Sequence, residues 1–299
     1  MIYLKEFSLV SENTENIILS EEKRTYFHNQ YPFRIFPKKE FKDIKFSDVT
    51  ILYGGNGSGK STILNIIANK LNCDGSFGAH GEMMMKYLDN CNFETSMEYF
   101  EEVKIIRSDD VFDYISNIRR INNRGFSQRE KLFREYFDNK DKTIDDMNDY
   151  QNLKNSIDAK RKSASNYVRS RVFDKDVKEQ SNGESALMYF VSEIKENSLY
   201  LLDEPENSMS AAMQLKLTKF LEESARFFNC QFIIATHSPF LLGMTGATIY
   251  DLDSVPATNK NFWELENMKL YYDFLNKIQQ NLSKNKFSHF YHIFFTFNC

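Results

Sequence analysis

One nine-residue segment constrains this chain more than any other. Its residues fit the pattern G-x-x-x-x-G-K-[ST] and are Gly54, Gly55, Asn56, Gly57, Ser58, Gly59, Lys60, Ser61 and Thr62. A β-branched run at 48–54 leads into it, and the apolar residues of 63–71 recur at helical spacing after it. A glycine-rich turn between a strand and a helix is the context in which this pattern binds phosphates. The segment therefore predicts a phosphate-binding loop, and a chance glycine-rich turn is the alternative.

Each part of this loop has a chemical role in that prediction. Glycines let successive backbone N–H groups curve around phosphate oxygens, and the start of the following helix adds partial positive charge. We expect Lys60 to reach the β and γ phosphates and the Ser61 hydroxyl to bind Mg²⁺. The loop thus predicts a bound nucleotide and a metal ion.

A second predicted strand ends in two carboxylates. The apolar run 199–202 is followed by Asp203 and Glu204. Because predicted strands alternate with helices, we expect a largely parallel sheet whose carboxyl edge collects ligands. There Asp203 is expected to help hold Mg²⁺, and Glu204 to polarise an attacking water. The alternative is an ordinary turn whose two acids face solvent.

A third predicted strand, 231–235, runs into Thr236 and His237. An imidazole at the same sheet edge can hydrogen-bond the γ-phosphate or the attacking water. We therefore expect His237 to be catalytic, with a purely structural histidine as the alternative.

These sites, in this order, resemble those of the ABC-type ATPase heads. The segment 180–185, Gln-Ser-Asn-Gly-Glu-Ser, looks like the family signature Leu-Ser-Gly-Gly-Gln, but it lacks the leucine and has Asn182 and Glu184 at two other positions. The resemblance implies an α/β fold, a P-loop NTPase with an ABC-ATPase-like core sheet, and ATP with Mg²⁺ as cofactors. It also implies a head-to-tail homodimer in which Ser181 and Gly183 act on the γ-phosphate held by the other subunit. A helix cap at Ser181 is the alternative interpretation.

The departures from the signature are more similar to the soluble AAA-family branch related to DNA-repair, chromosome-maintenance and phage-defence ATPases than to transporter subunits. The segment 205–210 follows Glu204 as the family's D-loop does, which would place 207–210 at the dimer interface; a helix cap at Asn207 or Ser208 is equally compatible. No clear Gln loop is present, and 107–110 occupies roughly its place. Tyr31 or Phe33 would be the adenine-stacking aromatic, although core packing is favoured for both.

The chain divides by composition into four stretches. We expect the ATPase core at 1–82 and 176–280, a mostly helical insertion at 83–175 and an aromatic-rich tail at 281–299. The opening alternation, which includes Ile17 and Leu19, predicts strands, and helical spacing is predicted near 265–278. The insertion carries a basic cluster whose members are Arg119, Arg120, Arg124, Arg129, Lys131 and Arg134. Neighbouring acids favour a salt-bridged helix surface over nucleic-acid binding.

Composition excludes several classes of protein. The 299 residues include four cysteines without paired or metal-type spacing, which argues against a disulfide framework or zinc site. The start of the chain lacks a signal-peptide pattern and no apolar run reaches 18 residues, so we expect a soluble cytoplasmic protein with no membrane contact. A formal net charge of −4 gives no overall attraction to nucleic acid.

Together these features predict a protein that hydrolyses ATP, dimerises on ATP and transmits the switch to DNA or to a protein partner such as a nuclease. The alternatives are an ATP-gated interaction switch with negligible turnover, a phosphotransferase acting on a small molecule, and a transporter-type nucleotide-binding subunit.

Overall fold

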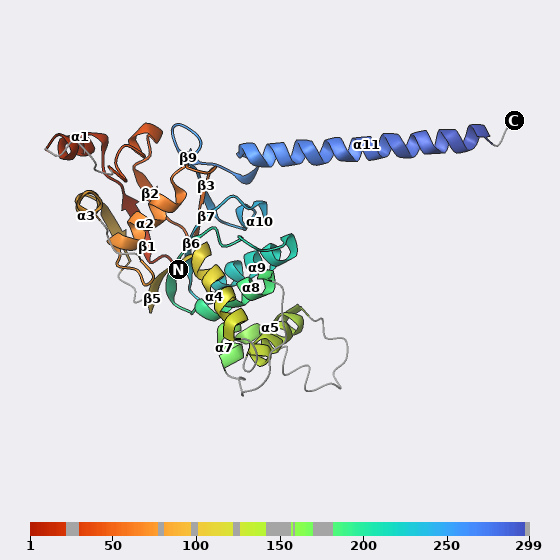
Figure 1. Ribbon diagram of the computed structural model, residues 1–299, viewed down its shortest axis with the longest axis horizontal. Coiled ribbons are helices and arrows are strands. Elements are labelled where there is room, and N and C mark those ends of the chain that lie inside the picture. Colours follow the sequence, from red (N-terminus) through yellow and green to blue (C-terminus); the bar gives the residue numbers. More distant parts are fainter. Residues whose placement is uncertain are drawn as a thin grey trace. The chain divides into compact units, whose positions relative to one another are not determined.

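The computed structural model describes residues 1–21, 30–76, 81–96, 101–121, 126–141, 157, 159–169 and 182–296. The chain forms two compact units, Met1–Thr258 and Asn259–Cys299. Figure 1 labels the elements of both. The division into core, insertion and tail expected from composition remains a prediction.

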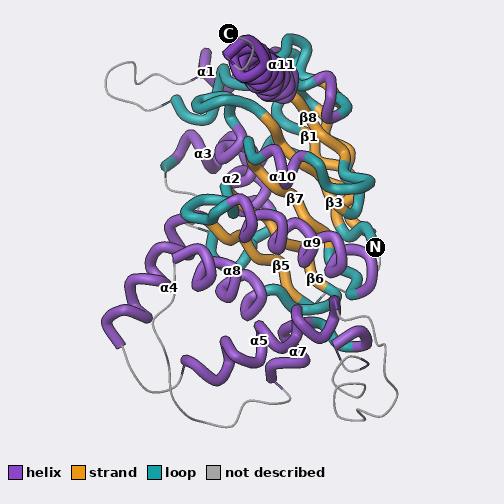
Figure 2. Tube along the Cα trace, turned by 90° about the vertical axis from the view of Figure 1, so that its right-hand side faces the viewer, coloured by secondary structure: helices purple, strands orange, loops and turns teal. Residues whose placement is uncertain are grey.

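A six-stranded sheet lies at the centre of the first unit, in the order β5-β6-β7-β3-β8-β9. Its strands are β5 (Glu102–Arg107), β6 (Ser198–Asp203), β7 (Gln231–Thr236), β3 (Val49–Tyr53), β8 (Thr248–Asp251) and β9 (Thr258–Asn259). The pairs from β5 through β8 are all parallel, and Figure 2 shows these strands side by side. The predicted α/β fold class is confirmed. Parallel pairing brings the carboxyl ends of these five strands to one edge, where ligands of such sheets bind.

Helices cover this sheet because their apolar faces match its apolar strands. The main ones are α2 (Lys60–Lys70), α8 (Asn182–Glu193), α9 (Ala211–Phe227) and the short α10 (Pro239–Leu242). α2 packs on β6 and β7 and buries Ile63, Ile66 and Ile67 completely. Burial of such side chains is the main stabilising contribution to a domain of this kind.

A second, antiparallel sheet has the order β2-β1-β4, with β2 (Asp43–Lys45), β1 (Leu4–Ser8) and β4 (Asn92–Thr95). One fully buried amide joins it to the large sheet. The Oε1 atom of Gln231 accepts from the N–H groups of Tyr3 and Leu4 at 2.8 and 2.9 Å. Its Nε2 atom donates to the carbonyl oxygens of Leu4 and Ser47 at 2.8 and 3.1 Å. Gln231 thus supplies the partners that these backbone groups would otherwise lack.

The chain after β1 differs from the prediction. Ile17 and Leu19 were expected in a strand, but they lie in the helix α1 (Glu12–Glu21). The preceding Ser11 starts this helix, because its Oγ accepts from Thr14 N–H at 3.3 Å and its carbonyl from Glu15 N–H at 2.8 Å. The carboxylate of Glu15 is buried and accepts from Arg34 N–H at 2.7 Å. Alternation of apolar residues was too sparse here to outweigh a serine cap.

The stretch 83–175, expected to be mostly helical, combines both kinds of structure. Its described helices are α3 (Glu82–Asp89), α4 (Ser108–Ile121), α5 (Phe126–Asp141) and α7 (Ala164–Arg169). The same stretch also supplies β4 and the edge strand β5, because the β-branched run around Ile105 and Ile106 is buried beside β6. Figure 1 shows α4, α5 and α7 gathered near α8 and α9. Lys140 of α5 forms an ion pair with Glu223 of α9.

The second unit consists of a short 3₁₀ turn (Phe262–Glu264) and one long helix, α11 (Glu266–Thr296). The predicted helix near 265–278 is confirmed, and it continues into the stretch expected to be a separate tail. Several apolar side chains on its first half are exposed: Leu270, Tyr271, Tyr272, Phe274, Leu275 and Ile278. Among the described residues, no helix combines the length and the apolar composition needed to cross a bilayer.

Replacing Gln231 with leucine should destabilise the first unit strongly. The change removes the Gln231 partner from four backbone groups, three of them in buried hydrogen bonds, so we expect the free energy of unfolding to fall by at least about 3 kcal/mol. Urea unfolding followed by circular dichroism measures the loss. Gln280→Leu, at an exposed position on α11, is the matched control and should leave the urea unfolding transition of the first unit unchanged. Equal stability of the two variants would contradict a joining role for Gln231.

Candidate functional site

The predicted phosphate loop connects β3 to α2. Gly57 and Gly59 have φ angles of 79° and 101°, which a residue with a side chain rarely adopts. A Cβ on Gly54 would lie 2.6 Å from the Ser58 Oγ, whereas a Cβ on Gly57 would meet nothing within 4 Å. The loop is therefore closed at its start and open at Gly57, where a ligand can approach the backbone.

Lys60 is the first residue of α2, and its side chain is buried within the loop. Its ammonium group donates to the carbonyl oxygens of Gly54 and Gly55 at 2.7 and 3.0 Å. The N–H groups of Lys60, Ser61 and Thr62 open the helix, so helical geometry gives them no intrahelical acceptor. Open backbone, a helix start and one ammonium group together fit a polyphosphate.

The two residues expected to bind Mg²⁺ lie in direct contact. Ser61 Oγ donates to Asp203 Oδ1 at 3.0 Å, although the residues are 142 positions apart in the chain. Burial raises the pKa of Asp203, and the hydrogen bond from Ser61 works in the opposite direction. No group of three or more His, Cys, Asp or Glu side chains suited to a metal occurs in the described part of the chain. A hydroxyl and one carboxylate fit Mg²⁺, which commonly takes few protein ligands and completes its shell with phosphate and water.

Glu204 and His237 directly follow the adjacent strands β6 and β7, and their side chains face each other. His237 Nδ1 lies 3.8 Å from Glu204 Oε1, and both side chains reach solvent, with exposed fractions of 47% and 27%. Glu204 has a φ of 49°, a left-handed conformation uncommon for glutamate. Two contacts hold it: its N–H donates to Ala235 O at 2.9 Å, and Asn207 Nδ2 donates to its Oε2 at 3.0 Å. A strained acid held from two sides is typical of a functional position.

Sequence reasoning missed Glu206, whose carboxylate contacts the backbone that carries His237. Its buried carboxylate Oε1 accepts from Thr236 Oγ1 at 2.5 Å and from the His237 N–H at 3.2 Å. The other oxygen, Oε2, is buried and has no hydrogen-bond partner among the described residues. Glu206 therefore ties the turn after Glu204 to the strand end that carries His237. The sequence offered one signal for it, a third acid two residues beyond Glu204.

Arg107 occupies the place where a Gln loop was sought. It ends β5 directly beside Asp203 of β6, in register, and is buried. Its guanidinium donates to Gly75 O at 2.6 Å and to Asn65 Oδ1 of α2 at 2.8 Å. Its N–H donates to Asp110 Oδ2 in the first turn of α4 at 2.8 Å. Burial lowers the pKa of Arg107, while nearby acids, Asp110 first, raise it. The residue connects the phosphate-loop helix to the start of α4.

Asp253 is a second residue that the sequence reasoning missed. It follows β8, the strand next to β3, and its Oδ2 accepts from the Gly55 N–H at 2.7 Å. The sequence did contain a signal for it. Asp253 lies just past a strand-like run, as Asp203 does, and that position was the reason for choosing Asp203. Strand order was needed to show that β8 ends beside the phosphate loop.

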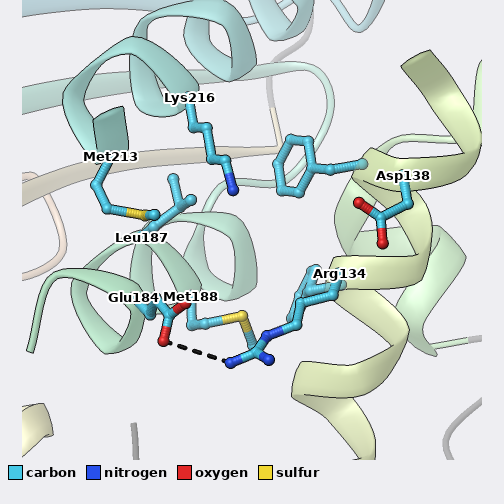
Figure 3. Close-up of a pocket in the computed structure, with 9 residues that line it drawn as sticks. Arg134, Asp138, Glu184, Leu187, Met188, Met213 and Lys216 are labelled. Atoms are coloured by element: carbon cyan, nitrogen blue, oxygen red, sulfur yellow. Dashed lines mark hydrogen bonds and ion pairs between the residues drawn. The ribbon is translucent and has the colours of Figure 1, made fainter. Parts of the chain in front are cut away.

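The signature-like segment is described only in part, because Ser181 lies outside the described residues. Gly183 is buried at the start of α8, where an added Cβ would lie 3.4 Å from Ser208 O. Glu184 pairs with Arg134 of α5 at 3.4 Å across a pocket of about 210 Å³, into which Lys216 of α9 also points (Figure 3). The start of α8 thus contacts the segment after Glu204 on one side and α5 on the other.

The remaining expectations have mixed outcomes. Phe33 is buried and packs edge-on against Tyr87, with ring centres 5.1 Å apart, which agrees with the core packing favoured for it. Tyr31 is 37% exposed, so the core packing favoured for it was wrong. The helix cap expected at Asn207 or Ser208 is instead Ser210, whose Oγ accepts from Met213 N–H at 3.4 Å. Asn207 is engaged with Glu204 and Ser208 has a φ of 67°, so neither begins the helix. In the predicted basic cluster, only the side chains of Lys131 and Arg134 are described.

Comparison with protein families gives two matches. The family model described as ABC transporter matches residues 42–207, which is more than half of the chain. A model for an AAA domain, whose description also names the AbiEii toxin of a type IV toxin–antitoxin system, matches residues 176–243. The first match spans the phosphate loop, Asp203 and Glu204, and the second spans His237. Comparison with curated proteins found no match.

Solved structures of low sequence identity are also similar. The SMC head domain from Thermotoga maritima is 15% identical, with a TM-score of 0.44, and the match covers 87% of this chain and 99% of that chain. The Smc head domain from Pyrococcus furiosus bound to the C-terminal domain of ScpA is 13% identical, with a TM-score of 0.45 and coverages of 93% and 100%. An ATP-binding cassette in a dimeric post-hydrolysis state with ADP and Pi is 13% identical, with a TM-score of 0.36 and coverages of 74% and 88%.

Replacing Asp203 with asparagine should stabilise the fold at neutral pH. Burial raises the pKa of Asp203, so its ionised form costs folding free energy above that pKa, whereas asparagine keeps an acceptor for Ser61 without the charge. We expect a higher urea midpoint for Asp203→Asn at pH 7. The difference from the wild type should shrink as the pH falls through the raised pKa. Asp89→Asn, at an exposed position, should show no such gain, and a less stable Asp203→Asn protein at pH 7 would contradict the expectation.

Proposed function

Because the chain belongs to the ABC transporter family, whose members bind ATP through a cassette of this kind, we propose that it hydrolyses ATP at the carboxyl edge of its six-stranded sheet. The observation that carries the proposal is the convergence of the phosphate loop, Asp203, Glu204 and His237 at that edge, with Ser61 and Asp203 already 3.0 Å apart. Three separate segments of the chain, 54–62, 203–204 and 237, supply one proposed reaction centre.

Binding is assigned to the loop 54–62. Its glycines and the first N–H groups of α2 surround the phosphates, and Lys60 moves its ammonium group from the carbonyl oxygens of Gly54 and Gly55 to phosphate oxygens. Ser61 and Asp203 would hold Mg²⁺, which would supply positive charge to neutralise the phosphates. The 3.0 Å contact between Ser61 Oγ and Asp203 Oδ1 supports the proposal that both oxygens bind one ion.

Hydrolysis is assigned to Glu204 and His237. Glu204 orients and polarises the attacking water, and Asn207 restricts its carboxylate to one position. His237 hydrogen-bonds the γ-phosphate or the same water, and Glu206 fixes the backbone from which it projects. The 3.8 Å separation of the imidazole and carboxylate leaves both able to contact one water.

Assembly follows from the resemblance of 180–185 to the family signature. We propose that two copies associate head-to-tail on ATP, so that Ser181 and Gly183 of one copy complete the site of the other. α8 begins at this segment and packs on α4 and α9, and α4 begins at the backbone contact between Arg107 and Asp110. We propose that ATP-driven closure moves α8 and, through its contact with α4, the helices of 108–169. We propose that these helices contact DNA or a protein partner such as a nuclease.

Glu204→Gln should abolish turnover and preserve ATP binding. Loss of the group that polarises the water should reduce phosphate release by roughly 100-fold or more, because general-base catalysis contributes about that much. Phosphate release and ATP affinity are measured on the same preparations. Glu101→Gln is the control, since this exposed acid precedes β5 at the opposite end of the strand. Full-rate turnover by Glu204→Gln would contradict the proposed base.

ATP should convert the Glu204→Gln protein from monomer to dimer. Because the variant retains nucleotide, light scattering should show a doubled mass with Mg-ATP and not without it. Adding Ser181→Arg to the same protein should prevent the doubling while ATP still binds. If the doubling occurs but the wild type shows no turnover, an ATP-gated switch replaces the ATPase proposal. A monomer under all conditions would refute assembly on ATP.

A further inference from the structure

The loop after β8 is fixed beside the phosphate loop. β8 and β3 are parallel neighbours, and Leu252 N–H extends their pairing by donating to Tyr53 O at 2.9 Å. Asp253 N–H donates to the carboxylate of Asp251 at 2.9 Å, and the ammonium group of Lys39 donates to Leu252 O. Backbone and side-chain contacts therefore determine where Asp253 lies.

The carboxylate of Asp253 lies directly against the start of the phosphate loop. Its Oδ2 accepts from Gly55 N–H at 2.7 Å, and its Oδ1 is 3.1 Å from the place where a Cβ on Gly54 would lie. The carbonyl of the same Gly55 accepts from the Lys60 ammonium group at 3.0 Å. Gly55 therefore contacts both the Asp253 carboxylate and the Lys60 ammonium group that is proposed to bind the phosphates.

A negative charge at this place affects two forms of the nucleotide unequally. ATP without a metal ion carries more negative charge than its Mg²⁺ complex, and the repulsion between two charged groups scales with the product of their charges. Asp253 is exposed, so solvent and salt weaken this repulsion without removing it. Metal-free ATP is therefore disfavoured more than Mg-ATP.

We propose that Asp253 makes the site selective for nucleotide bound to Mg²⁺, and that its hydrogen bond to Gly55 holds the phosphate loop in shape. This inference rests on the proposed ATP binding and adds a specificity-determining residue to it. The two parts of the role are separable. Asparagine keeps an oxygen acceptor for the Gly55 N–H and loses the charge, whereas alanine loses both.

The test is the affinity of the full-length chain for ATP, measured by isothermal titration calorimetry with EDTA and with excess MgCl₂. The ratio of the Kd in EDTA to the Kd in MgCl₂ reports the selectivity. For Asp253→Asn we expect this ratio to fall roughly three- to tenfold, mainly through tighter binding of metal-free ATP. Added salt should narrow the difference from the wild type. For Asp253→Ala we expect weaker binding than for Asp253→Asn in both buffers, because the loop loses its hydrogen bond.

Asp89→Asn is the charge-matched control. Asp89 ends α3, and the neighbouring Leu88 carbonyl accepts from Lys70 at the end of α2 farthest from the phosphate loop. Its ratio should equal that of the wild type. An unchanged ratio for Asp253→Asn would overturn the selectivity, and equal affinities of the asparagine and alanine variants would overturn the bracing hydrogen bond. A wild-type chain that binds ATP in neither buffer would instead overturn the proposed function, so the two failures are distinguishable.

Discussion

The parallel hydrogen bonds that align Tyr53 with Thr236 and with Asp251, and Asp203 with Ala235 and Arg107, set the positions of the other polar groups at the candidate site. The central strands β3, β6 and β7 are almost wholly buried, and a shift of their pairing by one residue would move every following loop by a residue. Gln231 adds a second constraint from the opposite end of β7, since its side chain fixes the antiparallel sheet to the same strand. The site inherits its geometry from strands whose apolar residues carry no chemistry themselves.

Sequence reasoning was most effective where a local pattern and a physical requirement coincide. The phosphate loop, the apolar strand before Asp203 and the strand before His237 each combine a run of β-branched residues with an abrupt change to polar ones. The α/β class and the resemblance to ABC-type ATPase heads followed from their order, and the family match to 42–207 agrees with both. Contacts between distant segments of the chain were harder to predict from the sequence. The hydrogen bond from Gly55 N–H to Asp253 and the one from Gln231 Nε2 to Leu4 O link residues about 200 positions apart or more, and no periodicity encodes them.

The errors have physical causes of the same kind. Ile17 and Leu19 looked like strand residues because apolar spacing alone was considered, while the Ser11 cap and the burial of Glu15 favour a helix. Asn207 and Ser208 are good capping residues, but Asn207 is used by Glu204, so the cap moves to Ser210. In both cases a side-chain hydrogen bond between residues three positions apart, Ser11 with Thr14 and Asn207 with Glu204, changed the local structure from the one expected.

β5 is at an edge of the large sheet, and the chain leaves it at Arg107 and returns as its neighbour β6 at Ser198. None of the described residues between them (108–121, 126–141, 157, 159–169 and 182–197) belongs to the large sheet, so this part of the backbone does not pass between two paired strands. Such a segment can lengthen, shorten or be exchanged during evolution without disturbing the pairing of β6, β7 and β3. Proteins that share one ancestral nucleotide site could thereby acquire different binding partners through changes in the single segment between β5 and β6.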